Sequence, residues 1–296
     1  MYERAAALDD QYADLHFRLA RCHLGAGMIE EARRDYATAR DWDALQLRAD
    51  SQLNRIIRNA AAELAPEGVY LVETDMAMAA SDRCPTGIPG AEFFYEHVHL
   101  RFDGDFETAK ALLPAVIEGL RRRGLSPSES ARVPSREECA QRLAFTEWDE
   151  VNTAAGMLHL TANAPFTEQL EHDRRQAEAQ KAVSDVMDRV DEEFVNRVIL
   201  AYEQAITSYP DDWTLRFNLG TFLHQLGRFS EAAGHLHHVV RTLPHVPAFR
   251  TLLGYALGKS GQVDPAIQQF REALKRDARY QEARKGLTWA RGLRSG

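Results

Sequence analysis

Apolar and small residues recur at a fixed spacing along the last third of the chain. Within residues 213–245 they lie three or four positions apart, which predicts two amphipathic helices, and Gly227 between them predicts a tight turn. The same pattern returns 34 residues later, in 247–279. A constant period of this length predicts stacked helix pairs. The equivalent residues are Leu219 and Leu253, Gly220 and Gly254, Gly227 and Gly261, Ala232 and Ala266, and Leu236 and Phe270.

This pattern resembles the tetratricopeptide repeat (TPR). Small residues such as Gly220 and Ala232 let two antiparallel helices approach, while large residues such as Leu236 fill the groove between them. We therefore expect a mainly α fold in which 193–296 form a TPR α-solenoid. The register also includes Tyr202, Ala205 and Pro210 upstream and Leu287 downstream.

The N-terminal residues follow the same register, which predicts a partial TPR block over 1–44. One period before Tyr36 and Ala39 lie Tyr2 and Ala5, so the chain is expected to begin inside the second helix of a unit whose first helix is missing. We interpret this as an N-terminal truncation. Localisation is then cytoplasmic only by default, because a signal or anchor would precede Met1. The positions that match are Leu19, Ala20, Gly27, Ala32, Tyr36 and Ala39.

Residues 45–124 have a different pattern. A helical stretch over 45–64 is followed by the short apolar run 69–73, which predicts a strand, then by a polar loop and a helix over 106–124. This order predicts a small α/β segment. One strand cannot form a sheet, so we expect no closed sheet. Exposed apolar surface is then expected around Val69, Leu71, Phe93 and Phe94.

The same segment resembles the C-terminal end of an SGNH (GDSL-like) hydrolase domain, and a bacterial group in which TPR units are inserted into such a domain. RADSQLNRIIR, GIPG and FYEHVHL carry the resemblance. It implies that His99 is the catalytic histidine, that Glu96 orients its ring, and that Gly104 turns the chain into the last helix. Glu96 stands where the family has aspartate, and His97 is an alternative to His99. On this assignment, Glu96 and His99 approach within hydrogen-bond distance and His97 points elsewhere.

The alternative is that these loop histidines only pack and form hydrogen bonds. A serine nucleophile in a GDS-like or GxSxG setting is absent from the sequence, and the family places it upstream of this segment. We therefore expect Glu96 and His99 to be a remnant or an incomplete site, so that this chain alone does not hydrolyse esters. A full-length parent with the serine would be an SGNH-type esterase or acyl hydrolase.

Charge and composition narrow the classes of partner. The net charge of −8 disfavours nucleic acid, and the longest apolar runs are too short for a membrane span. Three widely spaced cysteines predict neither a disulfide framework nor a zinc site. The histidines at 235, 237 and 238 are assigned to a solvated helix face, so no metal is expected. GYALGKS has three residues, not four, between its first glycine and Gly-Lys, so no nucleotide or other cofactor is expected.

Residues 125–192 are predicted to be a helical linker. Its first part is rich in serine and proline, and Ser135 with Glu138 forms a capping-box pattern that predicts a helix start. The remainder is charged and helical, with polar faces expected in solvent. It leads into the second repeat block.

The repeats predict an interaction scaffold whose groove binds a protein or peptide partner. The candidate groove residues are basic or amide-bearing, which favours an acidic peptide. The alternatives are that the repeats pack against their own hydrolase-like domain, or that they serve a larger SGNH-type hydrolase as partner modules. The candidates are Arg216, Asn218, His224 and Arg250.

Overall fold

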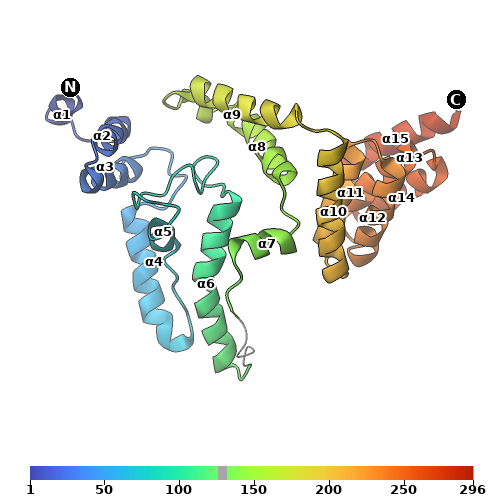
Figure 1. Cartoon of the computed structure of the whole chain (residues 1–296), viewed down its shortest axis with the longest axis horizontal. Helices are drawn as coiled ribbons and strands as arrows, with labels where there is room; N and C mark the ends of the chain where they lie inside the picture. Colours follow the sequence, from blue (N-terminus) through green and yellow to red (C-terminus); the bar gives the residue numbers. More distant parts are fainter. Residues whose placement is uncertain (126–131, 296) are drawn as a thin grey trace. The chain divides into compact units, whose positions relative to one another are not determined.

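The computed structural model describes residues 1–125 and 132–295. The chain divides into two compact units, Met1–Arg136 and Glu137–Gly296, which we call the N-terminal and C-terminal units. The division falls within the predicted linker. Each unit is built of helices and loops (Figure 1).

The N-terminal unit begins with the predicted helix pair. Gly27 has a left-handed φ of 76°, which makes the turn between α2 and α3, and Ala20 and Ala32 are fully buried where the two helices meet. A second group of helices follows, in which the Arg58 guanidinium donates to the carboxylate of Glu73, the residue before α5, at 2.7 and 2.8 Å. The helices are α1 (Tyr2–Ala6), α2 (Ala13–Gly25), α3 (Ile29–Asp41), α4 (Ser51–Leu64), η1 (Ala65–Glu67), α5 (Thr74–Ala79) and α6 (Phe102–Arg122).

The α/β expectation for 45–124 is not supported. Residues 69–73 form a loop segment instead of a paired strand, because no second strand lies beside them in the described part of the chain. The β-type pairing found among the described residues is an isolated antiparallel bridge between Phe94 and Leu100. The predicted helices are present, as α4 and α6.

A small core holds the loop between α5 and α6. Met78, Cys84 and Phe93 are buried together, and Phe94 and Leu100 pack against them. The expectation that Phe93 is exposed is therefore wrong: its exposed fraction is 0%. Val69 and Leu71 are exposed as expected, at 41% and 42%.

The C-terminal unit contains the regular repeats. A helix starts after Ser135 as predicted, and the Thr146 amide donates to the Asp149 carboxylate at 2.9 Å in the first turn of α8. The helices are α7 (Arg136–Arg142), α8 (Glu147–Thr161), η2 (Phe166–Glu168), α9 (His172–Met187), α10 (Glu192–Ser208), α11 (Trp213–Gln225), α12 (Phe229–Thr242), α13 (Pro247–Lys259), α14 (Val263–Arg276) and α15 (Gln281–Ser295).

Helix pairing in the repeats follows the predicted small residues. A Cβ added to Gly220 would lie 3.0 Å from Leu236 Cγ, and one added to Gly254 would lie 2.8 Å from the Phe270 ring. Gly227 makes the α11–α12 turn with φ 77°, and the matching α13–α14 turn uses the same conformation. The two helix pairs are therefore built alike, as the 34-residue spacing predicts.

Candidate functional site

The histidine-rich loop between α5 and α6 is held by two backbone hydrogen bonds. The Tyr95 amide donates to the His99 carbonyl at 2.9 Å, and the Arg101 amide donates to the Phe93 carbonyl at 2.7 Å. These bonds close a narrow loop that begins at the buried Phe93. The Glu96 carboxylate turns into this loop, where its side chain is only 6% exposed.

Glu96 accepts hydrogen bonds from the backbone and the rings around it. The amides of His99 and Val98 donate to its Oε1 at 2.8 and 3.2 Å, the His97 amide donates to Oε2, and the His99 ring Nδ1 contacts Oε1. Burial raises the pKa of Glu96, but the backbone and ring hydrogen bonds of His99, with the His97 and Val98 amides, lower it to about 2. The carboxylate is therefore a firmly ionised anchor for the loop.

Two histidine rings, not one, contact this carboxylate. The expected contact between Glu96 and His99 is confirmed, but the expectation that His97 points elsewhere is wrong, because its Nδ1 lies 3.1 Å from Glu96 Oε2. The turn is tight enough that adjacent side chains reach both carboxylate oxygens. Among the described residues, no serine hydroxyl contacts the His99 ring, so catalysis by Glu96 and His99 stays a prediction.

Gly104 has a different role from the predicted one. Helix α6 already begins at Phe102, so Gly104 lies inside the helix and does not turn the chain into it. A Cβ there would lie 2.6 Å from the Phe93 carbonyl oxygen and 2.8 Å from Leu100 Cδ2. Glycine is needed because α6 packs directly onto the loop backbone.

Metal ligation finds no support in this loop. The described residues include no group of three or more histidine, cysteine, aspartate or glutamate side chains placed to hold a metal ion.

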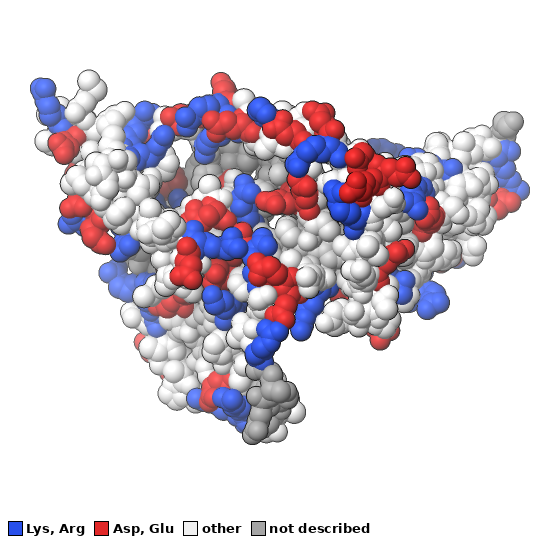
Figure 2. Space-filling model, viewed as in Figure 1, with Lys and Arg blue, Asp and Glu red and all other residues white. Residues whose placement is uncertain are grey.

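On the face shown in Figure 2, Lys and Arg are interspersed with Asp and Glu.

In the C-terminal unit, the predicted groove residues do not form one cluster. Arg250 Nε donates to the Pro244 carbonyl at 2.9 Å and its Nη1 donates to Gln269 Oε1 at 3.1 Å. One period later, Arg284 Nε donates to the Ala278 carbonyl at 3.0 Å. These arginines close the turn between successive helix pairs. The role of Arg250 in partner binding stays a prediction, and its guanidinium is already engaged.

Arg216 and Asn218 point to different neighbours. Two residues apart on a helix means about 200° of rotation, so their side chains cannot share a face. Arg216 lies near His235 and His238 of α12, and its buried Nε has no hydrogen-bond partner among the described residues. Asn218 is hydrogen-bonded to the buried hydroxyl of Tyr202, which also donates to Asp149.

His224 belongs to a cluster that sequence reasoning found only in part. Its ring meets the Phe229 ring edge-on at 5.2 Å between centroids, and Lys259 Nζ lies 4.9 Å from the centroid of the same Phe229 ring. Burial and the Lys259 charge lower the pKa of His224, whose buried Nε2 has no partner among the described residues. Lys259 directly follows Gly258, which occupies the same repeat position as His224, 34 residues later. This position in the repeat was the signal in the sequence that could have placed Lys259 near His224.

Comparison with known proteins identifies the repeats. Residues 199–244 and 248–280 each match a family model described as tetratricopeptide repeat. The chain carries tetratricopeptide repeats. These matches run from residue 199, inside α10, through α14, and they include the glycines and alanines that set the pairing described above. No curated protein matches the sequence significantly.

The chain is also similar, at low identity, to several solved structures. A structure titled MamA MSR-1 C2 is 20% identical, covers 53% of this chain and 84% of its own, and has a TM-score of 0.35. The P58(IPK) TPR domain is 15% identical, with coverages of 99% and 82% and a TM-score of 0.32. The yeast Sti1 TPR2AB domain in complex with pHSP90 is 16% identical, with coverages of 96% and 98% and a TM-score of 0.30.

The described helices include none that is both long enough and apolar enough to cross a bilayer. The longest, α6, contains charged residues along its length and a proline at position 114.

Proposed function

We propose that the C-terminal unit is a protein-binding scaffold whose TPR surface takes an acidic polypeptide segment at His224 and Lys259. The exposed Lys259 ammonium, which lies over the Phe229 ring that His224 also contacts, is the observation that carries this assignment. A carboxylate of the partner would pair with the exposed Lys259 ammonium beside the His224 and Phe229 rings.

Aromatic side chains on the first helices would supply the apolar part of the contact. The centroid of the Phe217 ring lies 5.0 Å from that of the Phe249 ring, and the centroid of the Trp213 ring lies 5.5 Å from that of the Phe249 ring. All three rings are partly exposed. An acidic segment with interspersed apolar residues fits this combination of rings and cations.

The test is direct binding of a defined peptide to the full chain. A dye-labelled decapeptide alternating glutamate and leucine should bind, and one alternating lysine and leucine should bind about tenfold more weakly or not at all. Lys259→Glu and His224→Ala should each weaken binding of the acidic peptide about tenfold. The matched control is Lys275→Glu on α14, where Lys275 pairs with Glu272.

Equal binding of the acidic and basic peptides would contradict the assignment. So would unchanged affinity in Lys259→Glu. A change of the same size in Lys275→Glu would show that net charge, and not the His224–Lys259 cluster, governs binding. Circular dichroism of each variant checks that the helices are retained.

A second function is favoured by one observation, the hydrogen bond between Glu96 and His99. We infer that this loop descends from the acid–histidine block of an SGNH hydrolase, in which the acid orients the ring for proton transfer. Ester hydrolysis should then require a serine supplied by another part of a complete protein. If His99→Ala in such a protein spares activity while His97→Ala abolishes it, the roles are reversed; if the complete protein is inert on acyl esters, the scaffold is the remaining function.

A further inference from the structure

The segment that joins η1 to α5 has unused backbone groups. The Val69 amide donates to the Leu64 carbonyl at 3.3 Å, but the amides and carbonyls of Tyr70, Leu71 and Val72 make no backbone hydrogen bond within the described part of the chain. Tyr70 is aromatic, Leu71 is apolar and Val72 is β-branched. Three such residues in a row with unpaired backbone hydrogen-bonding groups have the chemistry of a sheet edge.

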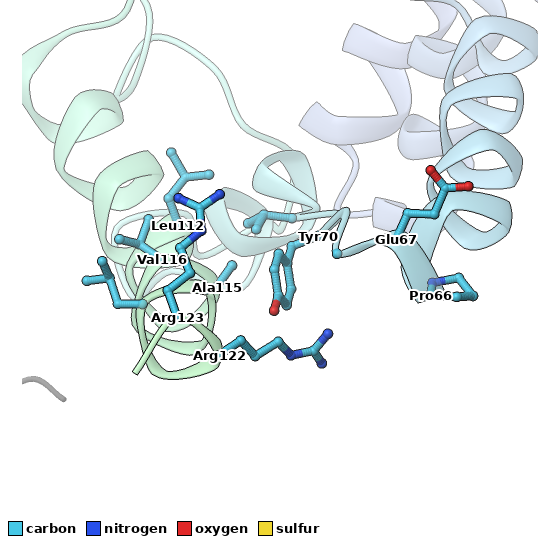
Figure 3. Close-up of a pocket in the computed structure, with 12 residues that line it drawn as sticks. Pro66, Glu67, Tyr70, Leu112, Ala115, Val116, Arg122 and Arg123 are labelled. Carbon is cyan, nitrogen blue, oxygen red and sulfur yellow. The ribbon is translucent and has the colours of Figure 1, made fainter. Parts of the chain in front are cut away.

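A cavity lies beside this segment. It has a volume of about 700 Å³ and opens between the 66–72 stretch and α6 (Figure 3). Figure 3 shows Tyr70 projecting between α6 and the turn that carries Pro66 and Glu67. The floor on α6 is apolar, and it consists of Leu112, Ala115, Val116, Gly119 and Leu120.

One end of the cavity is basic. Arg122 and Arg123 both line it, and the Arg122 guanidinium lies 5.1 Å from the centroid of the Tyr70 ring. Arg122 Nε also contacts Glu118 at 3.0 Å, whereas Arg123 has no ion pair among the described residues. The cavity is therefore suited to an occupant with apolar side chains and an acidic end.

Helix α4 also carries exposed apolar side chains. This helix has no buried residue, and the exposed side chains on it recur at helical spacing. Such a stripe normally packs against another layer. Its members are Leu53, Ile56, Ile57 and Leu64.

We propose that residues 69–72 are a docking edge for an extended segment of a partner protein, which adds to them as a β-strand. The bound strand satisfies the backbone groups of Tyr70, Leu71 and Val72, and its alternate side chains enter the cavity over α6. A helix could cover apolar side chains, but it has no free backbone groups to pair with this edge. An acidic residue of the strand pairs with Arg123.

The probe is a dye-labelled octapeptide that alternates valine and threonine and ends in two glutamates, titrated against the full chain. A version methylated on alternate backbone nitrogens keeps the side chains but loses donors along one edge. The unmodified peptide should bind, and the version methylated on the pairing edge should bind about tenfold more weakly. Both methylation registers are tested, because only one faces the protein.

Substitutions on this edge test whether the peptide binds there. Val72→Pro removes a backbone donor, and Leu71→Lys puts a charge on an exposed apolar position; each should weaken binding about tenfold. The matched control is Leu200→Lys on α10, because Leu200 is 53% exposed in the other unit. Arg123→Ala should weaken binding severalfold and reduce its dependence on salt.

Hydrogen exchange gives a readout that does not depend on variant folding. The amides of residues 70–72 should exchange rapidly in the free chain and about tenfold more slowly with bound peptide. Failure of the peptide to bind, equal binding of both methylated registers and the unmodified peptide, or unchanged exchange at 70–72 would each overturn the proposal. Protection of 70–72 that rises with protein concentration and disappears in Leu71→Lys would assign the edge to a second copy and overturn the partner assignment.

Discussion

Arg216 faces His235 at the same two repeat positions at which Arg250 faces Gln269, but only the second pair is hydrogen-bonded. Arg250 Nη1 reaches Gln269 Oε1 at 3.1 Å, whereas Arg216 Nε and His235 Nδ1 are buried and have no partner among the described residues. The side-chain oxygen of a glutamine accepts a hydrogen bond from a guanidinium. A histidine ring beside the same cation is a poorer acceptor. The first helix pair therefore carries a local mismatch.

Replacing His235 by glutamine should remove this mismatch. We expect His235→Gln to raise the free energy of unfolding of the C-terminal unit by on the order of 1 kcal/mol, because a buried donor gains an acceptor. Urea unfolding followed by circular dichroism measures the change. The reciprocal variant Gln269→His should lower the free energy of unfolding, and a loss of stability in His235→Gln would contradict this account.

Stability of the C-terminal unit should fall in mild acid. Burial lowers the pKa of His235, and Arg216 lowers it further, against the opposing charges of Glu203 and Glu231. A lowered folded-state pKa means that the unfolded chain binds the proton more readily, so the stabilising contribution is full above about pH 6.5 and is lost as the pH falls below it. Unfolding measured at pH 7.5 and pH 5.5 should show the loss, and His235→Gln should reduce it.

The Glu96 carboxylate should stabilise the N-terminal unit at neutral pH. Its pKa is lowered to about 2, so its contribution is full above its unfolded value near 4.5 and is lost as the pH falls toward 2. At pH 7, Glu96→Gln should destabilise the unit by on the order of 2 kcal/mol, because a neutral amide accepts the amide and ring hydrogen bonds less strongly. Glu63→Gln, on an exposed position of α4, is the control and should change stability little. An equal loss of stability in Glu63→Gln would contradict a specific role of Glu96.

Gly104→Ala should disrupt the contact between α6 and the histidine loop. The added Cβ would lie 2.6 Å from the Phe93 carbonyl oxygen, a backbone atom that cannot easily move away. We therefore expect the free energy of unfolding to fall by about 1–3 kcal/mol. Gly156→Ala in α8 meets nothing within 4 Å and should instead be neutral or stabilising by up to about 1 kcal/mol. Thermal unfolding of the two variants compares them, and equal melting temperatures would contradict the close packing.

Features that depend on neighbours in sequence could be predicted without the structure. The helix pairs, their turn glycines and the buried alanines follow from a repeating local pattern, and Gly227 and Gly261 occupy the expected turns. The contact between Glu96 and His99 could also be predicted from the sequence, because the two residues lie three positions apart in one tight loop. The same proximity brings His97 to the carboxylate, which the assignment of separate roles overlooked.

The remaining features were decided only by the tertiary structure, because they depend on contacts between segments that lie far apart in the sequence. The apolar run 69–73 has the composition of a strand, yet no second strand lies beside it in the described part of the chain, and the backbone groups of residues 70–72 make no backbone hydrogen bond there. His224 and Lys259 come together only because both contact the Phe229 ring of α12. Arg250 donates hydrogen bonds to the Pro244 carbonyl in a turn and to Gln269 on α14. Local pattern determines which helices form, whereas burial and long-range pairing determine which side chains remain free to bind.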